Sequence, residues 1–192
     1  MLGLMQDHQL LISSIFEHAI KSYPTQEIVS NTVEGGIHKY SFKEWGLRTK
    51  KLANALKSTG LKIGDRVGTL AWDGYRHLEL YYATSSSGLI CHTLNPRLHH
   101  DQISYIVNHA EDKILFVDLN IAPLVEKASK NFSSVQAVVV MTDKKNMINL
   151  NLPKDIKILC YEEFIEKESD EFHWPELDER TASSLCYTSG TT

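Results

Sequence analysis

The sequence lacks any apolar run close to the roughly 18–20 residues that a membrane span needs. It also lacks an excess of positive charge, because 20 Lys and Arg are outnumbered by 24 Asp and Glu, for a net charge of −4. Its first residues, MLGLMQDHQLL, include no basic leader and reach Asp7 early, which argues against a secretory signal. We therefore expect no transmembrane segment, no nucleic-acid partner and no secretion.

Cysteine is scarce. The three cysteines, Cys91, Cys160 and Cys186, are widely spaced, and no two form a CxxC pair. All three fall in or beside apolar, strand-like runs. Such a set indicates reduced, buried thiols rather than disulfides, and it predicts a cytoplasmic location.

Two nucleotide-binding motifs are missing. No GxxxxGK[ST] segment is present, which excludes the usual mononucleotide P-loop, and no GxGxxG segment is present, which excludes a dinucleotide fingerprint. What is present is ordinary globular composition, with 42% hydrophobic and 23% charged residues. A chain of 192 residues with this composition can bury a sizeable core.

Residues 1–40 predict an N-terminal arm and a hairpin. An apolar helical stripe includes Leu10, Ile15 and Phe16 and ends at Pro24. Two strand-like segments at 28–30 and 37–40 then flank a Glu-Gly-Gly turn. We expect the arm to pack on its own domain or on a second subunit.

Residues 41–192 predict a second unit, in which strands and helices alternate. Ser41 and Glu44 match a capping box at the start of a helix that Gly60 ends. The alternation is typical of the α/β class, here a doubly wound and largely parallel sheet with helices on both faces. We expect strands at 67–72, 89–93, 114–117, 135–141, 156–160 and 182–187, with helices at 75–87, at 101–110 and around Pro123.

The last residues, SLCYTSGTT, read as a short strand followed by a loop of hydroxyl residues and one glycine. Backbone N–H groups and hydroxyls in such a loop can surround phosphate oxygens, and Gly190 permits a close approach of the backbone. The alternative is a plain polar turn, because turns of this composition are common. In parallel sheets ligands bind at the carboxyl ends of strands, where this loop is expected to lie.

The segment Tyr187 to Thr192, YTSGTT, resembles the first part of the phosphate loop of the adenylate-forming ligases. The stretch YSFKEWGLRTKKLANALKSTGLKIGDRV resembles a segment of these ligases that leads into the first strand of the sheet. The stretches LAWDGYRHLELYYA, CHTLNPRLHHDQISYIVNHAEDKILFVD and RTASSLCYTSGTT resemble the members that act on medium- and long-chain fatty acids. The resemblance implies an ATP-dependent, AMP-forming acyl-CoA synthetase of fatty acid and lipid metabolism. It also implies that these residues are the N-terminal part of the large domain of a much longer protein, truncated inside its phosphate loop.

The resemblance assigns roles to the last residues. Ser189, Gly190, Thr191 and Thr192 would hold the β- and γ-phosphates of ATP, and Thr188 would contact the phosphates or ligate Mg²⁺ through its hydroxyl. CoA would be the second substrate, and no catalytic residue lies within these 192 residues. We expect this chain by itself to be inactive.

Alternative functions stay open at this point. The same scaffold serves ligases for aryl or other carboxylic acids, and a non-enzymatic α/β module for dimerisation or ligand binding is a further alternative. The resemblance also implies a homodimer formed through the N-terminal region.

Other candidate residues have simple structural alternatives. His92, His99, His100 and His109 suggest a metal site, but we expect no complete ligand set, with His92 at a strand end and His109 at a helix C-terminus.

The segment Trp72–Asp73–Gly74 is a site loop or a plain turn before a helix. Arg97 contacts CoA or a partner, or it is solvated. We expect the acidic run 162–179 to be a solvated face, and Trp45, Leu78, Tyr81 and Tyr82 to belong to the core.

Overall fold

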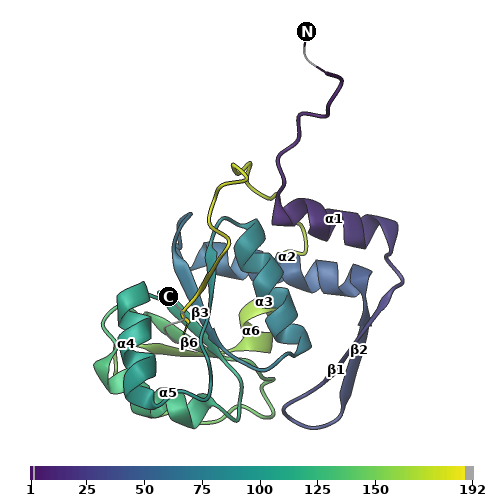
Figure 1. Ribbon diagram of the computed structural model, residues 1–192. Helices are drawn as coiled ribbons and strands as arrows, with labels where there is room; N and C mark the ends of the chain where they lie inside the picture. Colours follow the sequence, from purple (N-terminus) through teal and green to yellow (C-terminus); the bar gives the residue numbers. More distant parts are fainter. Residues whose placement is uncertain (2, 189–192) are drawn as a thin grey trace.

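The computed structural model describes residue 1 and residues 3–188 (Figure 1). Its centre is a six-stranded, wholly parallel sheet with the strand order β7-β6-β5-β3-β4-β8, and a separate antiparallel pair is formed by β1 and β2. The α/β fold with a largely parallel sheet is therefore confirmed. The strands are β1 (Glu27–Asn31), β2 (Ile37–Ser41), β3 (Arg66–Leu70), β4 (Ile90–Thr93), β5 (Ile114–Val117), β6 (Ala137–Val140), β7 (Lys157–Cys160) and β8 (Ser184–Cys186).

Helices cover both faces of the sheet (Figure 1). One face packs against α2, α3 and α6, and the other packs against α4 and α5. The central strands are buried on both faces, which explains why they read as continuous apolar runs rather than as alternating patterns. The helices are α1 (Ile12–Ser22), α2 (Phe42–Ser58), α3 (Tyr75–Ser86), α4 (His100–Ala110), α5 (Ala122–Ala128) and α6 (Tyr161–Glu166), and a 3₁₀ turn spans Ser129–Asn131.

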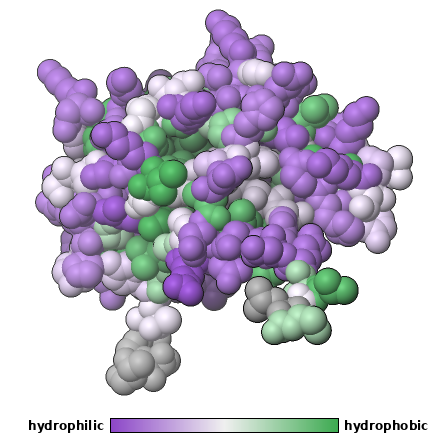
Figure 2. Space-filling model, turned by 90° about the horizontal axis from the view of Figure 1, so that it is seen from above, coloured by the Kyte–Doolittle hydropathy of each residue, from purple (hydrophilic) through white to green (hydrophobic). Residues whose placement is uncertain are grey.

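No helix in the described part of the chain is both long enough and apolar enough to span a bilayer. Seen from above, the surface shows hydrophobic residues in small groups separated by hydrophilic ones (Figure 2).

The N-terminal helix α1 lies on α2 and α3 through Phe16, which is fully buried and meets Trp45 edge-on at 4.8 Å between ring centroids. Leu10 and Ile15, however, are 82% and 57% exposed. The expectation that Leu10 and Ile15 share the buried face of Phe16 is wrong, because Ile15 and Phe16 are consecutive residues and lie about 100° apart around a helix.

The start of α2 follows a local rule that the sequence carries. The Ser41 hydroxyl accepts a hydrogen bond from the Glu44 backbone N–H, and the Glu44 carboxylate accepts one from the Ser41 backbone N–H at 2.7 Å. At the other end, Gly60 adopts a left-handed conformation with φ of +84°. The predicted capping box and helix end are both confirmed.

Replacing Ser41 by Ala is expected to lower the free energy of unfolding by about 1 kcal/mol, because it removes the acceptor for the Glu44 amide. Urea unfolding monitored by circular dichroism measures this change. Ser41→Asn is the matched control, since Asn caps helices as well as Ser does. Equal losses in both variants would contradict the capping role.

Two segments between the sheet strands contribute side chains to the core. The loop from 142 to 155 contributes several partly buried apolar side chains to the core under α4 and α5. The run from 162 to 179 begins inside α6, and its Phe172 and Trp174 pack against buried residues of α2 and α3. The expectation of a wholly solvated acidic face is therefore wrong.

Candidate functional site

The carboxyl edge of the sheet is the place where the expected phosphate loop begins. Strand β8 pairs in parallel with β4, with Leu185 opposite His92, and leads into Tyr187 and the exposed Thr188. The other residues expected in the loop, 189–192, lie outside the described residues. The structure thus places Thr188 at a strand's carboxyl end, the position at which parallel sheets bind ligands.

The neighbouring strand β4 ends beside this point. Asn95 and Pro96 follow it, and the Asn95 side-chain oxygen accepts a hydrogen bond from the Arg97 backbone N–H at 2.9 Å. The side chain of Arg97 is exposed. Arg97 therefore lies on the same edge of the sheet as Thr188, one strand away.

A buried His–Asp pair lies within the sheet behind Tyr187. His92 and Asp112 both have fully buried side chains, and the His92 Nδ1 is 2.9 and 2.8 Å from the two carboxylate oxygens. Burial raises the pKa of Asp112, and the hydrogen bond from His92 opposes that rise. Strand β3 runs between the two residues, and its Gly68 leaves the space that the Asp112 carboxylate occupies.

Sequence reasoning placed His92 near a strand end but missed its partner Asp112. The sequence feature that could have indicated a close neighbour such as Asp112 is Gly68, since a glycine inside a strand often marks the close approach of another group. A Cβ atom at Gly68 would lie 2.9 Å from Asp112 Oδ2.

Tyr187 makes contacts with both α4 and β4. Its hydroxyl shares a hydrogen bond with Nδ1 of His109, which lies in the last turn of α4 as expected. The Tyr187 ring centroid is also 5.3 Å from that of His92. Two histidines of the predicted set therefore meet at Tyr187, although not as metal ligands.

A second candidate position at the carboxyl ends of the strands is the crevice between β3 and β5. The Trp72 backbone N–H donates to Asp118 Oδ2 at 2.7 Å, and the Trp72 indole N–H donates to Asn120 Oδ1 at 3.2 Å. Burial raises the pKa of Asp118 to about 6, against the lowering effect of the Trp72 amide. Gly74 is the N-cap of α3, so the segment after β3 is the turn that the sequence predicted as one alternative.

Protein side chains largely fill this crevice. Glu34, from the turn between β1 and β2, accepts hydrogen bonds from Arg76 and Thr142, both at 2.8 Å. The remaining hollow measures about 50 Å³. Little room is left for a ligand between β3 and β5.

A network of charged side chains joins α2, α3 and α6; Glu79 is fully buried, and Arg48 and Glu162 are partly exposed. Arg48 Nε donates to Glu79 at 2.8 Å, and its Nη1 donates to Glu162 at 2.9 Å. Burial raises the pKa of Glu79. Burial acts in the same direction on Glu162, but hydrogen bonds from Arg48 and Arg76 outweigh it and lower the pKa of Glu162. This network is structural, and sequence reasoning missed it.

The largest hollow described among these residues, of about 830 Å³, lies on the β6–β7 side of the sheet, away from β8. It is lined by residues of β2, α2 and α6 together with Asp143 and Lys144, which follow β6. Strands β7 and β6 lie at the far end of the strand order from β8. Size alone therefore does not connect this hollow with Thr188.

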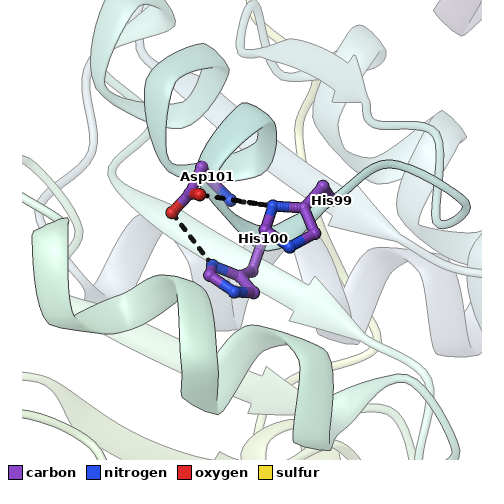
Figure 3. A group of neighbouring side chains, drawn as sticks. All are labelled: His99, His100 and Asp101. Carbon is purple, nitrogen blue, oxygen red and sulfur yellow. Dashed lines mark hydrogen bonds and ion pairs between the residues drawn. The ribbon is translucent and has the colours of Figure 1, made fainter.

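His99, His100 and Asp101 form a close group at the start of α4 (Figure 3), with ligand atoms within 4.8 Å of one another. The expectation that no carboxylate would complete such a set is wrong, because Asp101 does so. Yet His99 is the N-cap residue, and its Nδ1 accepts from the Asp101 backbone N–H. The partial positive charge of a helix N-terminus also disfavours a cation there. We interpret the group as a helix cap.

Together, the wholly parallel strand order and the helices on both faces define an α/β protein of the kind that binds ligands at the carboxyl ends of its strands. The sequence profile of the family described as "AMP-binding enzyme" matches residues 16–192. The chain therefore belongs to the AMP-binding enzyme family.

Individual relatives agree with this assignment. The chain is 43% identical over 192 residues, all of this chain and 35% of the relative, to the medium-chain-fatty-acid–CoA ligase of Ectopseudomonas oleovorans. It is 38% identical over 188 residues, 98% of this chain and 32% of the relative, to the long-chain-fatty-acid–CoA ligase of Thermus thermophilus. The chain spans about a third of the length of the curated relatives it matches.

Among solved structures, the fold is similar to that of the anthranilate CoA ligase AuaEII in complex with anthranoyl-AMP. The TM-score is 0.80 at 20% identity, and the match covers 96% of this chain and 33% of the other. This likeness supports the fold alone.

Proposed function

We propose that this chain supplies the first part of the large domain of an AMP-forming ligase that activates a fatty acid and transfers it to CoA. The observation that carries the proposal is the path of β8, which runs beside β4 and leads into Tyr187 and Thr188 at the sheet's carboxyl edge. The sequence there continues as SGTT. Relatives described as fatty-acid–CoA ligases, at 43% and 38% identity, support the reaction class.

In this proposal the loop 188–192 binds the phosphates of ATP. Thr188 is exposed at the strand end, and its hydroxyl is the kind of hard oxygen ligand that Mg²⁺ prefers, so the residue fits the metal. Ser189, Gly190, Thr191 and Thr192 supply backbone N–H groups and hydroxyls for the β- and γ-phosphates. Bound Mg²⁺ would offset phosphate charge while these residues hold ATP in position.

The acid is proposed to be a medium- or long-chain fatty acid, which places the protein in lipid metabolism. The alternative is another carboxylic acid on the same scaffold. A relative at 43% identity is described as a 3-methylmercaptopropionyl-CoA ligase, which favours testing short acids too.

We also propose two structural units, an arm with a hairpin at 1–40 and the α/β unit at 41–192. The exposed Leu10, which precedes α1, and the exposed Ile15, which lies within α1, support a homodimer through the arm. The cysteines are all free, which supports a reducing compartment such as the cytoplasm. Cys91 and Cys160 are buried as expected, but Cys186 is exposed, so the expectation of a buried thiol is wrong for Cys186.

The test is an assay of the full-length protein that carries this chain, with ATP, Mg²⁺, CoA and acids of two to eighteen carbons, including aryl acids. We expect acyl-CoA, AMP and pyrophosphate in equal amounts, with the highest kcat/KM for fatty acids. Preference for an aryl or short acid would change the substrate class. No ATP-dependent product with any acid would overturn the enzyme proposal in favour of a binding or dimerisation module. Residues 1–192 alone are expected to be inactive.

A further inference from the structure

Tyr187 lies directly between the last strand and the loop that begins at Thr188. Strand β8 has three residues, and among the described residues it pairs with β4 alone. Whatever holds the Tyr187 side chain therefore fixes the direction in which the chain enters the loop.

Two elements hold that side chain. His109 of α4 shares a hydrogen bond with the Tyr187 hydroxyl, and the two rings meet edge-on at 5.8 Å and 85°. One helical turn earlier, Tyr105 stacks on His109 at 5.7 Å and 22°. The His109 ring is thus itself held between two tyrosines.

The other side of the Tyr187 ring faces the interior of the sheet. His92 is 5.3 Å from it between ring centroids, and its position is fixed by two contacts of Nδ1 with the buried Asp112 carboxylate. A fully buried imidazole that is hydrogen-bonded to a buried carboxylate is a well-fixed support. The supports come from β4, which pairs with β3 inside the sheet, and from α4, whose Ile103 and Val107 lie in the core.

We propose that His109 is a positioning residue for nucleotide binding: by holding Tyr187 against His92 it orients the phosphate loop. The proposal rests on the function proposed above. His109 and Thr188 are exposed and Tyr187 is partly so, so the hydrogen bond adds little to global stability. The hydrogen bond between His109 and Tyr187 acts mainly on the three-residue strand β8 and on the loop that follows β8.

The experiment uses the full-length enzyme and two variants that break this contact, His109→Ala and Tyr187→Phe. Each is expected to raise the Kd and the KM for ATP about three- to ten-fold, the effect of losing one hydrogen bond, while kcat and the KM for the acid stay within two-fold. The double variant should be no worse than either single one, because both remove the same contact. His109→Asn keeps a nitrogen or oxygen near the Nδ1 position and should restore most of the affinity.

His173→Ala is the matched control, since His173 is an exposed histidine in the segment that follows α6. It should leave the Kd for ATP unchanged. Wild-type Kd values in His109→Ala and Tyr187→Phe, or fully additive losses in the double variant, would overturn the positioning role while the enzyme remains active. An inactive wild-type enzyme would instead remove the proposed function.

Discussion

Replacing Arg48 by Met is expected to lower the free energy of unfolding by about 3 kcal/mol at pH 8, because it leaves the Glu79 carboxylate buried without its charge partner. The Glu79 side chain is fully buried, and Arg48 contacts both of its oxygens, at 2.8 and 3.2 Å. Tyr161 donates a hydrogen bond to Glu79 at 2.6 Å. We expect the variant to keep this hydrogen bond but to lack the positive charge beside Glu79. Chemical denaturation gives the loss.

The destabilisation by Arg48→Met should depend on pH. Burial already raises the pKa of Glu79, and removal of Arg48 takes away the main opposing effect. The folded variant then binds a proton where the unfolded chain does not, so its stability falls as pH rises. The loss should therefore be smaller at pH 5 than at pH 8.

Lys39→Met is the control for Arg48→Met. Lys39 pairs with Glu27 across the hairpin at 3.6 Å, but both side chains are more than half exposed. Such a pair contributes about 0–1 kcal/mol. If Arg48→Met cost no more than Lys39→Met, the buried network would not stabilise the fold.

Replacing Gly68 by Ala is expected to lower the free energy of unfolding by about 2 kcal/mol through overpacking. The added Cβ would clash with Leu115 Cδ2 and would lie 2.9 Å from Asp112 Oδ2. Alanine would by itself favour a strand over glycine by about 0.5–1 kcal/mol, but the clash is larger because Leu115 is fully buried and Asp112 is held by His92. Thermal and urea unfolding measure the net effect.

A double-mutant cycle with Leu115→Ala isolates the clash at Gly68. Leu115→Ala removes the nearest atom, so Gly68→Ala should cost less in that background than in the wild type. The Nδ1 proton resonance of His92 should also shift in Gly68→Ala, because Asp112 must move. Additive losses with an unchanged His92 resonance would show that the sheet accommodates the methyl group without strain.

Local patterns predicted the elements of this fold well. The capping box of Ser41 and Glu44 needs only residues three apart, and the strands of the central sheet are apolar runs between turns. The parallel sheet followed from their alternation with helices. The buried side of α1 could not be predicted from local patterns, because the adjacent Ile15 and Phe16 are both apolar. Only tertiary packing decides which of the two is buried.

Local sequence patterns could not predict contacts between residues that are far apart in the sequence. Asp112 reaches His92 across the whole of β3, and Glu162 belongs to a buried network although it stands in an acidic run. The composition of such a run predicts that its side chains are exposed to solvent. Glu162 is instead partly buried, because it pairs with Arg48 of α2 and Arg76 of α3. Of the candidate site, Thr188 could be placed by sequence, whereas the contact of Tyr187 with His109 required the structure.

The strand order also has a consequence for how the molecule is assembled. Strand β8 pairs with β4, although β5, β6 and β7 lie between β4 and β8 in the sequence. The helices α2 to α6 and the five other sheet strands contain nearly all of the buried core, so they can collapse while the chain is still being synthesised. The pairing of β8 closes the longest loop of the sheet and is therefore a late folding step. The seam between β4 and β8 should open first on mild destabilisation, and amide hydrogen exchange at Cys91 and Thr93 would then be faster than at Val138 and Val139.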